Sequence, residues 1–218
     1  MNAGLFSDLP GALAHLVWPC SCPVCGAVGV VACPECIVKI LEPPLDECLL
    51  CGGGAPCASH PGAPWLRTGG SHEGVRRDLV LRLKYGGERR LGREMGEALA
   101  RVFPKPEVDV LVPVPLHSES KRLYNQASVL AEGMGRIWDI PAARVREGSG
   151  PQETQTKKHA AQRRKLDANA LRCRKGAIGR VLLVDDVCTT GSTLRCAAEC
   201  IRSSGGRVIG ALTWSRSG

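Results

Sequence analysis

Aromatic residues are scarce in this sequence, and long apolar runs are missing. Phe, Trp and Tyr make up 4% of the 218 residues, which argues against a surface that binds single-stranded nucleic acid mainly by stacking bases on aromatic rings. No apolar run approaches the ~20 residues that a membrane-spanning helix needs. The first ten residues contain no basic residue, and Asp8 and Pro10 interrupt their apolar sequence, so the N-terminus is a poor secretory signal. We therefore expect a soluble, cytoplasmic protein without a transmembrane segment.

The proportions of hydrophobic and charged residues are typical of a folded protein. Hydrophobic residues make up 44% and charged residues 23%, which excludes a disordered or fibrous chain. A chain of this length buries a core without help from oligomerisation. Its charge is uneven, because residues 1–65 carry −4 and the remainder carries +12, giving the total of +8. This division indicates two regions of different character.

Cysteines are concentrated in the acidic region, where eight of the twelve lie between Cys20 and Cys57. Such a density indicates a disulfide framework or a metal site, and a reducing compartment favours metal. Three Cys-x-x-Cys pairs occur, and a fourth pair has His as its second member. The eight candidate ligands are Cys22, Cys25, Cys33, Cys36, Cys48, Cys51, Cys57 and His60. They predict two closed, tetrahedral, structural Zn²⁺ sites.

The pairing of these ligands is open at this point. Consecutive pairs or alternate pairs would satisfy the same spacing, and Cys20 is a spare thiol that would be able to replace a neighbour. Residues 19–64 contain no long periodic segment, so we expect metal binding rather than a hydrophobic core to fold them. Removing the metal should then unfold this segment and spare the rest of the chain.

Three regions follow one another along the chain. Leucines at helical spacing before Pro19 predict an amphipathic helix over residues 1–18. The Cys-, Gly- and Pro-rich segment 19–64 comes next, and a longer domain occupies residues 66–218. In that domain we expect helices over 74–85, 88–102, 124–138 and 193–203, and strands over 108–114, 140–145, 181–184 and 208–213. Strands that alternate with helices predict an α/β domain with a mainly parallel sheet.

Residues 181–193 are the most informative segment. They consist of an apolar strand, the adjacent acids Asp185 and Asp186, a hydroxyl-rich turn and the start of a helix. Ligands of open α/β sheets bind at the carboxyl ends of strands, and N–H groups at a helix start suit a phosphate dianion. Because the acids would repel a phosphate, they should face ribose hydroxyls or Mg²⁺. No Gly-x-x-x-x-Gly-Lys occurs, so a Walker-type phosphate loop is excluded.

This segment resembles the signature of type I phosphoribosyltransferases, which bind phosphoribosyl pyrophosphate (PRPP). The resemblance implies that Asp185 and Asp186 hold the ribose 2′- and 3′-hydroxyls. It also implies a loop that binds the 5′-phosphate of PRPP, with Mg²⁺ as the accompanying cation. The residues of this cofactor-binding loop are Val187, Cys188, Thr189, Thr190, Gly191, Ser192 and Thr193.

Over nearly its full length the chain resembles the ComF family of competence proteins and their GntX-like relatives. Further family-like motifs are Leu-Lys-Tyr-Gly at 83–86, Val-Pro-Val-Pro-Leu at 112–116, Lys-Arg-Leu-Tyr-Asn-Gln-Ala at 121–127, and Gln-Thr-Lys-Lys at 155–158 followed by Arg163 and Arg164. The chain departs from the family at Leu123, where glycine is usual, and in the loop after Lys158. The resemblance implies a double zinc ribbon over 19–64 and a type I phosphoribosyltransferase-like, mainly parallel sheet flanked by helices over 66–218.

A basic segment precedes the proposed phosphate-binding strand. Residues 144–180 contain eleven basic and three acidic residues, a local charge of +8. A mobile basic loop would stabilise departing pyrophosphate, but the same charge would also attract a nucleic-acid backbone or simply be solvated. With the first interpretation, the catalytic set comprises Asp185 and Asp186 at the ribose and Lys84, Lys157, Lys158 and Arg163 at the pyrophosphate.

Two classes of function remain open from the sequence. The first is a Mg²⁺-dependent phosphoribosyltransferase that moves the phosphoribosyl group of PRPP to an unidentified acceptor. The second is a non-catalytic, PRPP-responsive module that binds single-stranded DNA through the basic loop, or competence-machinery proteins through the zinc ribbon, during DNA uptake. A transcriptional sensor is a weaker third option, since no helix-turn-helix segment is visible.

Overall fold

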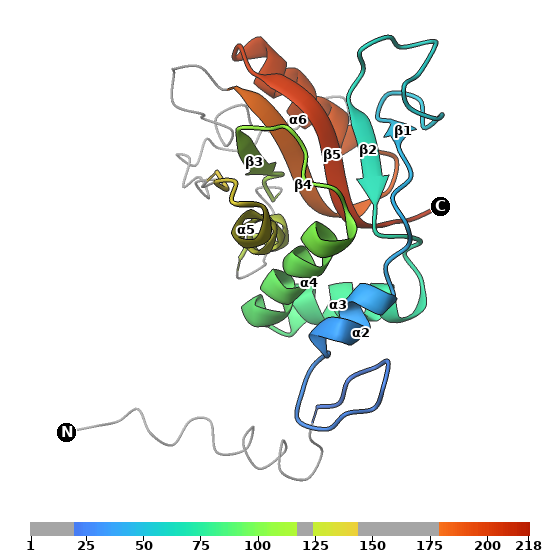
Figure 1. The fold of residues 1–218 in the computed structure, drawn as a ribbon, viewed down its shortest axis with the longest axis vertical. Coiled ribbons are helices and arrows are strands. Elements are labelled where there is room, and N and C mark those ends of the chain that lie inside the picture. The colour runs from blue at the N-terminus through green and yellow to red at the C-terminus, as the bar shows by residue number, and fades with distance from the viewer. Residues whose placement is uncertain (1–19, 117–123, 144–178) are drawn as a thin grey trace, which may run out of the picture.

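The described part of the chain forms one five-stranded sheet with helices on both faces (Figure 1). A computed structural model describes residues 20–116, 124–143 and 179–218. The strand order is β1-β2-β5-β4-β3, and neighbours from β2 to β3 pair in parallel. The short strand β1 runs antiparallel to β2 at one edge. The predicted α/β architecture with a mainly parallel sheet is therefore confirmed.

The elements have the following bounds. The strands are β1 (Glu47–Cys48), β2 (Trp65–Thr68), β3 (Val110–Pro113), β4 (Arg180–Cys188) and β5 (Arg207–Arg216). The helices are α2 (Pro34–Lys39), α3 (Gly74–Tyr85), α4 (Arg89–Val102), α5 (Gln126–Trp138) and α6 (Ser192–Ser203). Sequence reasoning found the four longer helices to within two residues and missed α2, β1 and β2. Of the strand expected over 140–145, the described part forms a single bridge, between Ala142 and Leu111.

Strand β4 lies between two hydrophobic cores, which explains its uninterrupted apolar sequence. Leu182 and Val184 pack in the larger core with α3, α4 and α5, whereas Val181 and Leu183 pack in the smaller core with α6. All four side chains are fully buried. The strand also extends beyond the expected Val184, because β5 continues to pair with it as far as Cys188.

Helices α4 and α5 approach each other so closely that their backbones touch. A Cβ atom on Gly96 would overlap the carbonyl oxygen of Leu130, and one on Gly133 would overlap the carbonyl oxygen of Arg93. Glycine is required at both positions for the two helices to pack in this way. Asn125 caps the start of α5, where its side chain accepts a hydrogen bond from the N–H of Ala127 at 3.0 Å. The start of α5 is thereby fixed beside the sheet.

The cysteine-rich segment shares the main core of the molecule. Ile37 of α2 is completely buried and packs with residues of α4 in the larger core. Strand β1 joins the sheet through β2. The expectation that residues 19–64 lack a hydrophobic core is therefore wrong at α2, because this six-residue helix contributes a core side chain, whereas folding by metal stays a prediction. The helix expected over residues 1–18 lies outside the described residues.

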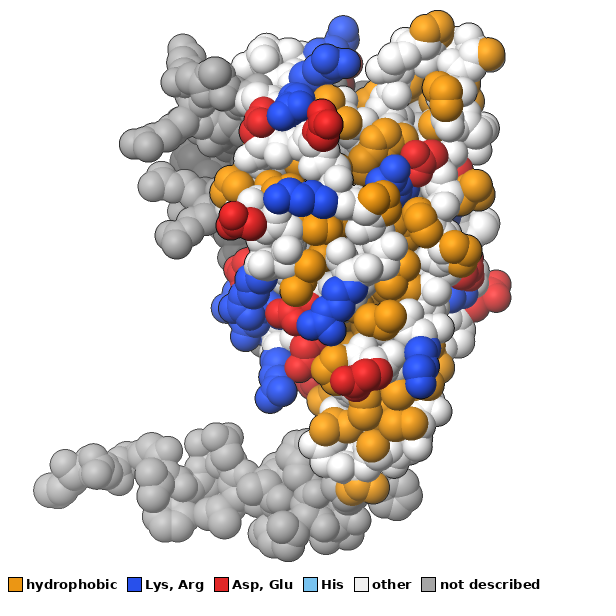
Figure 2. Space-filling model, in the orientation of Figure 1, with side chains coloured by type: hydrophobic (Ala, Val, Ile, Leu, Met, Phe, Trp, Pro, Cys, Tyr) orange, Lys and Arg blue, Asp and Glu red, His pale blue; other side chains and the backbone are white. Residues whose placement is uncertain are grey.

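The surface of the molecule shows where this segment exposes apolar side chains. Figure 2 shows hydrophobic side chains at the lower end of the described molecule. Val24, Val28 and Val30, from the first cysteine-rich loop, are exposed by 41%, 69% and 40%. Within the described ranges, no helix is both long enough and apolar enough to cross a membrane.

Candidate functional site

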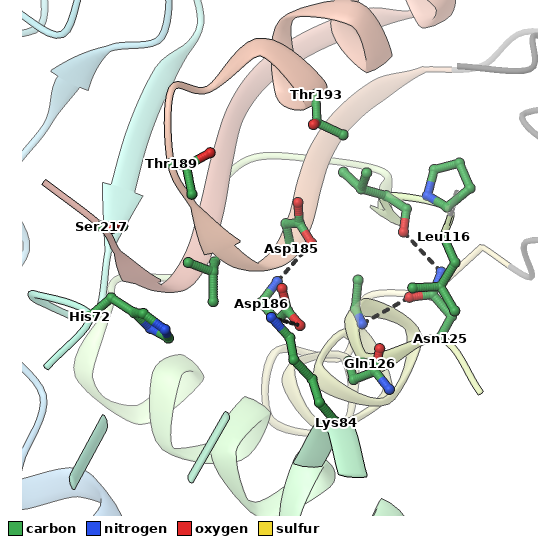
Figure 3. Close-up of a pocket in the computed structure, with 14 residues that line it drawn as sticks. His72, Lys84, Leu116, Asn125, Gln126, Asp185, Asp186, Thr189, Thr193 and Ser217 are labelled. Carbon is green, nitrogen blue, oxygen red and sulfur yellow. Dashed lines mark hydrogen bonds and ion pairs between the residues drawn. The ribbon is translucent and has the colours of Figure 1, made fainter. Parts of the chain in front are cut away.

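A cavity of about 340 Å³ lies at the carboxyl ends of β3 and β4 (Figure 3). Its lining combines residues that follow β3, the start of α5, the acids of β4 and the turn before α6. His72 and Lys84 complete the lining from the region of α3. Open α/β sheets bind their ligands at this position. The cavity therefore contains both acids that the sequence identified, together with Thr189 and Thr193 of the predicted phosphate loop.

Asp185 and Asp186 lie inside β4 rather than after it. Consecutive strand residues project to opposite faces, and Figure 3 shows the Asp186 carboxylate beside Lys84. Asp186 is 6% exposed and Asp185 is half-buried. The Asp185 carboxylate also accepts a hydrogen bond from the N–H of Asp186 at 2.8 Å. Both acids are thus held in place by the strand.

Lys84 forms an ion pair with Asp186. Its Nζ lies 3.2 Å from the Asp186 Oδ2, and the two side chains are only 15% and 9% exposed. Lys84 reaches the cavity from the last turn of α3. A buried ion pair is strongly sensitive to loss of one partner, so removing either side chain alone should destabilise this part of the cavity. The sequence-based assignment of Lys84 to pyrophosphate remains a prediction.

The turn between β4 and α6 has the geometry of an anion site. Gly191 adopts φ 71°, a left-handed conformation that favours glycine. The Thr190 hydroxyl donates to the Ser192 hydroxyl at 3.0 Å and accepts from the Ser192 N–H at 3.4 Å. Thr189, Thr190 and Ser192 are exposed, and the first N–H groups of a helix have no partner within it. The turn can therefore offer hydroxyls and N–H groups to a phosphate.

Cys188 has a different position from the rest of the predicted loop. Its side chain is 3% exposed and packs in the smaller core with Leu194 and Ala197. Burial, and next the charge of Asp185, raises the pKa of this thiol. Cys188 therefore fills space beneath the turn as a neutral side chain. Val187 does line the cavity.

Asn125 and Gln126 form the opposite wall of the cavity and were absent from the sequence-based site. Asn125 donates from Nδ2 to the carbonyl of Val114 at 2.9 Å, which joins the start of α5 to the end of β3. Gln126 is 1% exposed and lines the cavity. Both lie in the family-like motif at 121–127, which was the available signal for them. The first three residues of that motif lie outside the described ranges.

His72 is a second lining residue that sequence reasoning missed. Its Nδ1 lies 2.8 Å from the Ser215 hydroxyl, and its backbone N–H donates to the Arg216 carbonyl at 2.6 Å. Burial lowers the pKa of His72, as do the positive charges of Lys84 and Arg77, while Asp186 raises it. A lone histidine in a loop carries no sequence signal, because its partners lie 143 residues away.

The lowered pKa of His72 predicts a pH-dependent loss of stability. In the unfolded chain, His72 binds a proton near the ordinary histidine pKa of ~6.5, whereas in the folded protein it binds the proton only at a lower pH. The contribution of His72 should therefore be present above about pH 6.5 and decline as the pH falls toward the folded-state pKa. Urea unfolding of the parent and of His72→Asn between about pH 7.5 and 5.5 measures this difference. If the free energies of unfolding of the two proteins change with pH in parallel, the prediction is contradicted. Titration of the cysteine groups affects both proteins equally and cancels in this comparison.

The eight predicted metal ligands form two separate groups. Cys22, Cys25, Cys33 and Cys36 make the first, and Cys48, Cys51, Cys57 and His60 make the second. Within each group the ligand atoms lie within 4.8 Å of one another. Consecutive pairs therefore come together, which answers the question that the spacing left open. Cys20 belongs to neither group.

Local geometry and donor type both suit Zn²⁺. Gly26 and Gly52 follow the second cysteine of their pairs at φ 75° and 77°, which permits the tight turn. Burial raises the pKa of the Cys22 thiol, but hydrogen bonds from backbone N–H groups outweigh burial and lower it to about 6. A hydrogen bond with the Cys25 sulfur, 3.6 Å away, and next burial raise the pKa of the Cys33 thiol to about 12. Four thiolates this close need a cation, and sets of four sulfurs, or three sulfurs and one nitrogen, are typical of structural zinc.

The structure thus places part of the predicted catalytic set. Lys84, Asp185 and Asp186 meet at one cavity, and Thr189 and Thr193 of the predicted phosphate loop line the same cavity. The predicted pyrophosphate contacts Lys157, Lys158 and Arg163 lie outside the described residues.

Comparison with known proteins identifies relatives that match part of this chain. No protein-family model matches the chain. The competence protein ComFC of Bacillus subtilis is 30% identical over 141 residues, 62% of this chain and 57% of that protein. Competence protein F of Haemophilus influenzae is 32% identical over 104 residues, 44% of this chain and 45% of that protein. The amidophosphoribosyltransferase of Escherichia coli is 29% identical over 134 residues, 57% of this chain and 24% of that enzyme.

These matches have a limited extent. The chain spans about half the length of the two competence proteins and about a quarter of the amidophosphoribosyltransferase. The sequence motifs, the mainly parallel sheet and the two cysteine groups agree with this relationship. Over part of its length, the chain is a homologue of these two competence proteins and of the amidophosphoribosyltransferase.

Proposed function

We propose that this protein binds PRPP with Mg²⁺ in the cavity at β3 and β4 and transfers its phosphoribosyl group to an acceptor. The observation that carries the proposal is the meeting of paired acids and a phosphate-binding turn at one cavity. Similarity to an amidophosphoribosyltransferase supports the same substrate class. A ligand with a sugar between two phosphate groups fits this order of carboxylates and N–H donors.

Different residues of the cavity contact different parts of the substrate. Asp185 and Asp186 accept hydrogen bonds from the ribose hydroxyls, and the ion pair with Lys84 holds the Asp186 side chain in position. The turn from Thr189 to Thr193 holds the 5′-phosphate through N–H groups and hydroxyls. In the transfer, the bond from C1′ to the pyrophosphate oxygen breaks and a bond from C1′ to the acceptor forms. Positive charge builds up on the ribose meanwhile, and the carboxylates stabilise it. Mg²⁺ would neutralise the leaving pyrophosphate.

Calorimetric titration tests the binding part of this proposal. We expect PRPP to bind in the presence of Mg²⁺, and ribose 5-phosphate to bind more weakly through the turn alone. Pyrophosphate release, assayed with PRPP, Mg²⁺ and a panel of nucleobases, tests the transfer. Absence of PRPP binding would reject the proposal altogether. Binding without pyrophosphate release from any acceptor would favour a PRPP-responsive binding protein instead.

A role in handling single-stranded DNA is the second candidate. Two relatives are named competence proteins, and residues 144–180 carry a local charge of +8. With 4% aromatic residues, such binding would be mostly electrostatic. We propose that Lys157, Lys158, Arg163 and Arg164 supply contacts to phosphates, either of PRPP or of DNA.

Neutralising these four basic residues with glutamine should separate the two parts of the ligand site. Ribose 5-phosphate affinity should stay nearly unchanged, because the turn before α6 is intact. PRPP should bind more weakly, and the log–log salt slope of single-stranded DNA binding should fall by roughly 0.7 per lost phosphate contact. Calorimetry and fluorescence anisotropy at several salt concentrations measure these changes.

A control with the same change of charge shows whether position matters. Arg90, Arg101, Arg136 and Arg202 are 88%, 51%, 62% and 74% exposed. Their replacement by glutamine removes four positive charges elsewhere on the molecule and should leave PRPP binding unchanged. If the basic-loop variant binds PRPP and DNA as the parent does, the segment is only a solvated loop.

A further inference from the structure

Arg195 joins the phosphate-binding turn to the second cysteine group. This side chain comes from the first turn of α6, and its Nη1 donates to the carbonyl of Thr190 at 2.9 Å. The same nitrogen lies 3.5 Å from the carbonyl oxygen of Leu49. Leu49 directly follows the ligand Cys48 and is 2% exposed. A half-buried guanidinium therefore bridges two backbone segments that lie far apart in the sequence.

The end of β5 makes a second connection between the same two regions. Arg216 forms an ion pair with Glu47 of β1, and its Nη2 would lie 3.4 Å from a Cβ atom on Gly52. The N–H of the next residue, Ser217, donates to the carbonyl of Cys188 at 2.9 Å. Cys188 is the last residue of β4 before the turn. Both ends of the turn are thus connected to the loop that carries the second cysteine group.

The first cysteine group has a different environment. Its loop leads into α2, which packs against α4 through Ile37. Figure 1 shows this loop at the end of the molecule opposite β1. The two groups have similar metal chemistry but contact different parts of the fold. Variants of the first group therefore serve as controls for variants of the second.

We propose that Arg195 is a positioning residue through which the metal-bound second cysteine group sets the conformation of the phosphate-binding turn. With a metal ion in place, the segment from Cys48 to Cys51 is held rigidly, and the Leu49 carbonyl stays in reach of Arg195. Arg195 then fixes the Thr190 carbonyl, which restricts the conformations that the turn can adopt. Without the ion, Arg195 loses one of its two acceptors and the turn gains alternative conformations. The inference rests on phosphate binding by this turn, although the coupling is measurable without any ligand.

Amide hydrogen exchange of residues 188–193 tests the coupling directly. We expect roughly tenfold faster exchange in Arg195→Gln, since a hydrogen bond from a charged group is lost. Loss of the second ion in His60→Ala should have a similar effect. Arg202→Gln, on the same helix and 74% exposed, should leave this exchange unchanged. Cys25→Ser, which affects the first group, should speed exchange mainly near α2 and speed it in the turn clearly less than His60→Ala does.

Binding of ribose 5-phosphate provides a second measurement. Its affinity should fall by roughly tenfold in Arg195→Gln and in His60→Ala, with the melting temperature of Arg195→Gln close to that of the parent. Arg195→Lys keeps the charge but not the two-acceptor geometry, so it should restore affinity only in part. Elemental analysis checks that His60→Ala has lost one zinc ion and Arg195→Gln none.

Each possible result separates the coupling from the proposed function. Unchanged exchange at 188–193 in Arg195→Gln would overturn the coupling, whether or not ribose 5-phosphate binds. Equal acceleration in Cys25→Ser and His60→Ala would also overturn it, because general destabilisation would then explain both. Faster exchange in a protein that binds no ribose 5-phosphate would keep the coupling and reject phosphate binding. If a ligand variant fails to fold, the Arg195 variants decide alone.

Discussion

Replacing Asp185 and Asp186 together with asparagine is expected to weaken PRPP binding by roughly 10²- to 10⁴-fold. Each carboxylate should contribute charge-assisted hydrogen bonds to ribose hydroxyls, worth ~1.5–3 kcal/mol per residue. The structure adds a second effect at Asp186, because Lys84 would keep a half-buried positive charge without its partner. Asp186→Asn should therefore cost stability as well as affinity, whereas Asp185→Asn should cost mainly affinity. Calorimetry with PRPP and Mg²⁺, together with urea unfolding, measures the two effects.

Two further variants separate binding from folding. Lys84→Met combined with Asp186→Asn removes both charges and should recover part of the stability lost in Asp186→Asn, but not the PRPP affinity. Asp109→Asn is the matched control, because Asp109 is 52% exposed and pairs with Arg180 at the far end of the sheet. Equal PRPP affinity in the parent and in Asp185→Asn/Asp186→Asn would reject this assignment of the site.

Loss of either zinc ion should have the largest effect on stability. A structural zinc site contributes about 10 kcal/mol to folding at neutral pH. We expect two zinc ions per chain in the parent, and one each in Cys25→Ser and Cys51→Ser. Because α2 places Ile37 in the larger core, loss of the first ion should also destabilise the α/β domain, in contrast to the sequence-based expectation. Elemental analysis and thermal unfolding with and without chelator measure these changes.

Cys20 provides the control for the zinc experiment. It lies two residues before Cys22 and outside both groups, so Cys20→Ser should retain two zinc ions and the stability of the parent. Protein purified without chelators and found to contain no zinc would contradict the assignment. Loss of zinc from Cys20→Ser would show that the ligand groups differ from those in the structure.

The parts of the fold that sequence reasoning found have strong local signals. Val181 to Val184 form a continuous apolar run because both faces of β4 are covered, and the longer helices have enough turns to show periodicity. Strand β2 lacks such a signal, because it has only four residues. One of them is Arg67, whose Cζ lies 4.1 Å from the centroid of the Trp65 ring. It becomes a strand through pairing with β5. Helix α2, with six residues, is too short to show a helical period.

The candidate site also contains residues with a local sequence signal and residues without one. Asp185, Asp186 and Gly191 lie within seven residues of one another, so one local pattern revealed them. His72 and Ser215 meet only because β2 and β5 are neighbours in the sheet. The grouping of the cysteines was also unpredictable, since two pairings are compatible with one spacing. Sequence reasoning therefore found the contiguous half of the cavity and, through a family-like motif, Lys84, but missed His72, which only tertiary contacts bring to the cavity.

The glycine contact between α4 and α5 offers a way to observe the cavity without disturbing it. Because the backbones touch at Gly96 and Gly133, the two helices should move as one rigid body. An exposed ion pair between Arg136 of α5 and Glu97 of α4 adds little to this contact, and Arg136 is 62% exposed. A fluorophore attached at that position would report any displacement of the wall formed by Asn125 and Gln126 as ligand enters. Gly96→Ala should not be combined with the fluorophore, because the added methyl group would push the two helices apart.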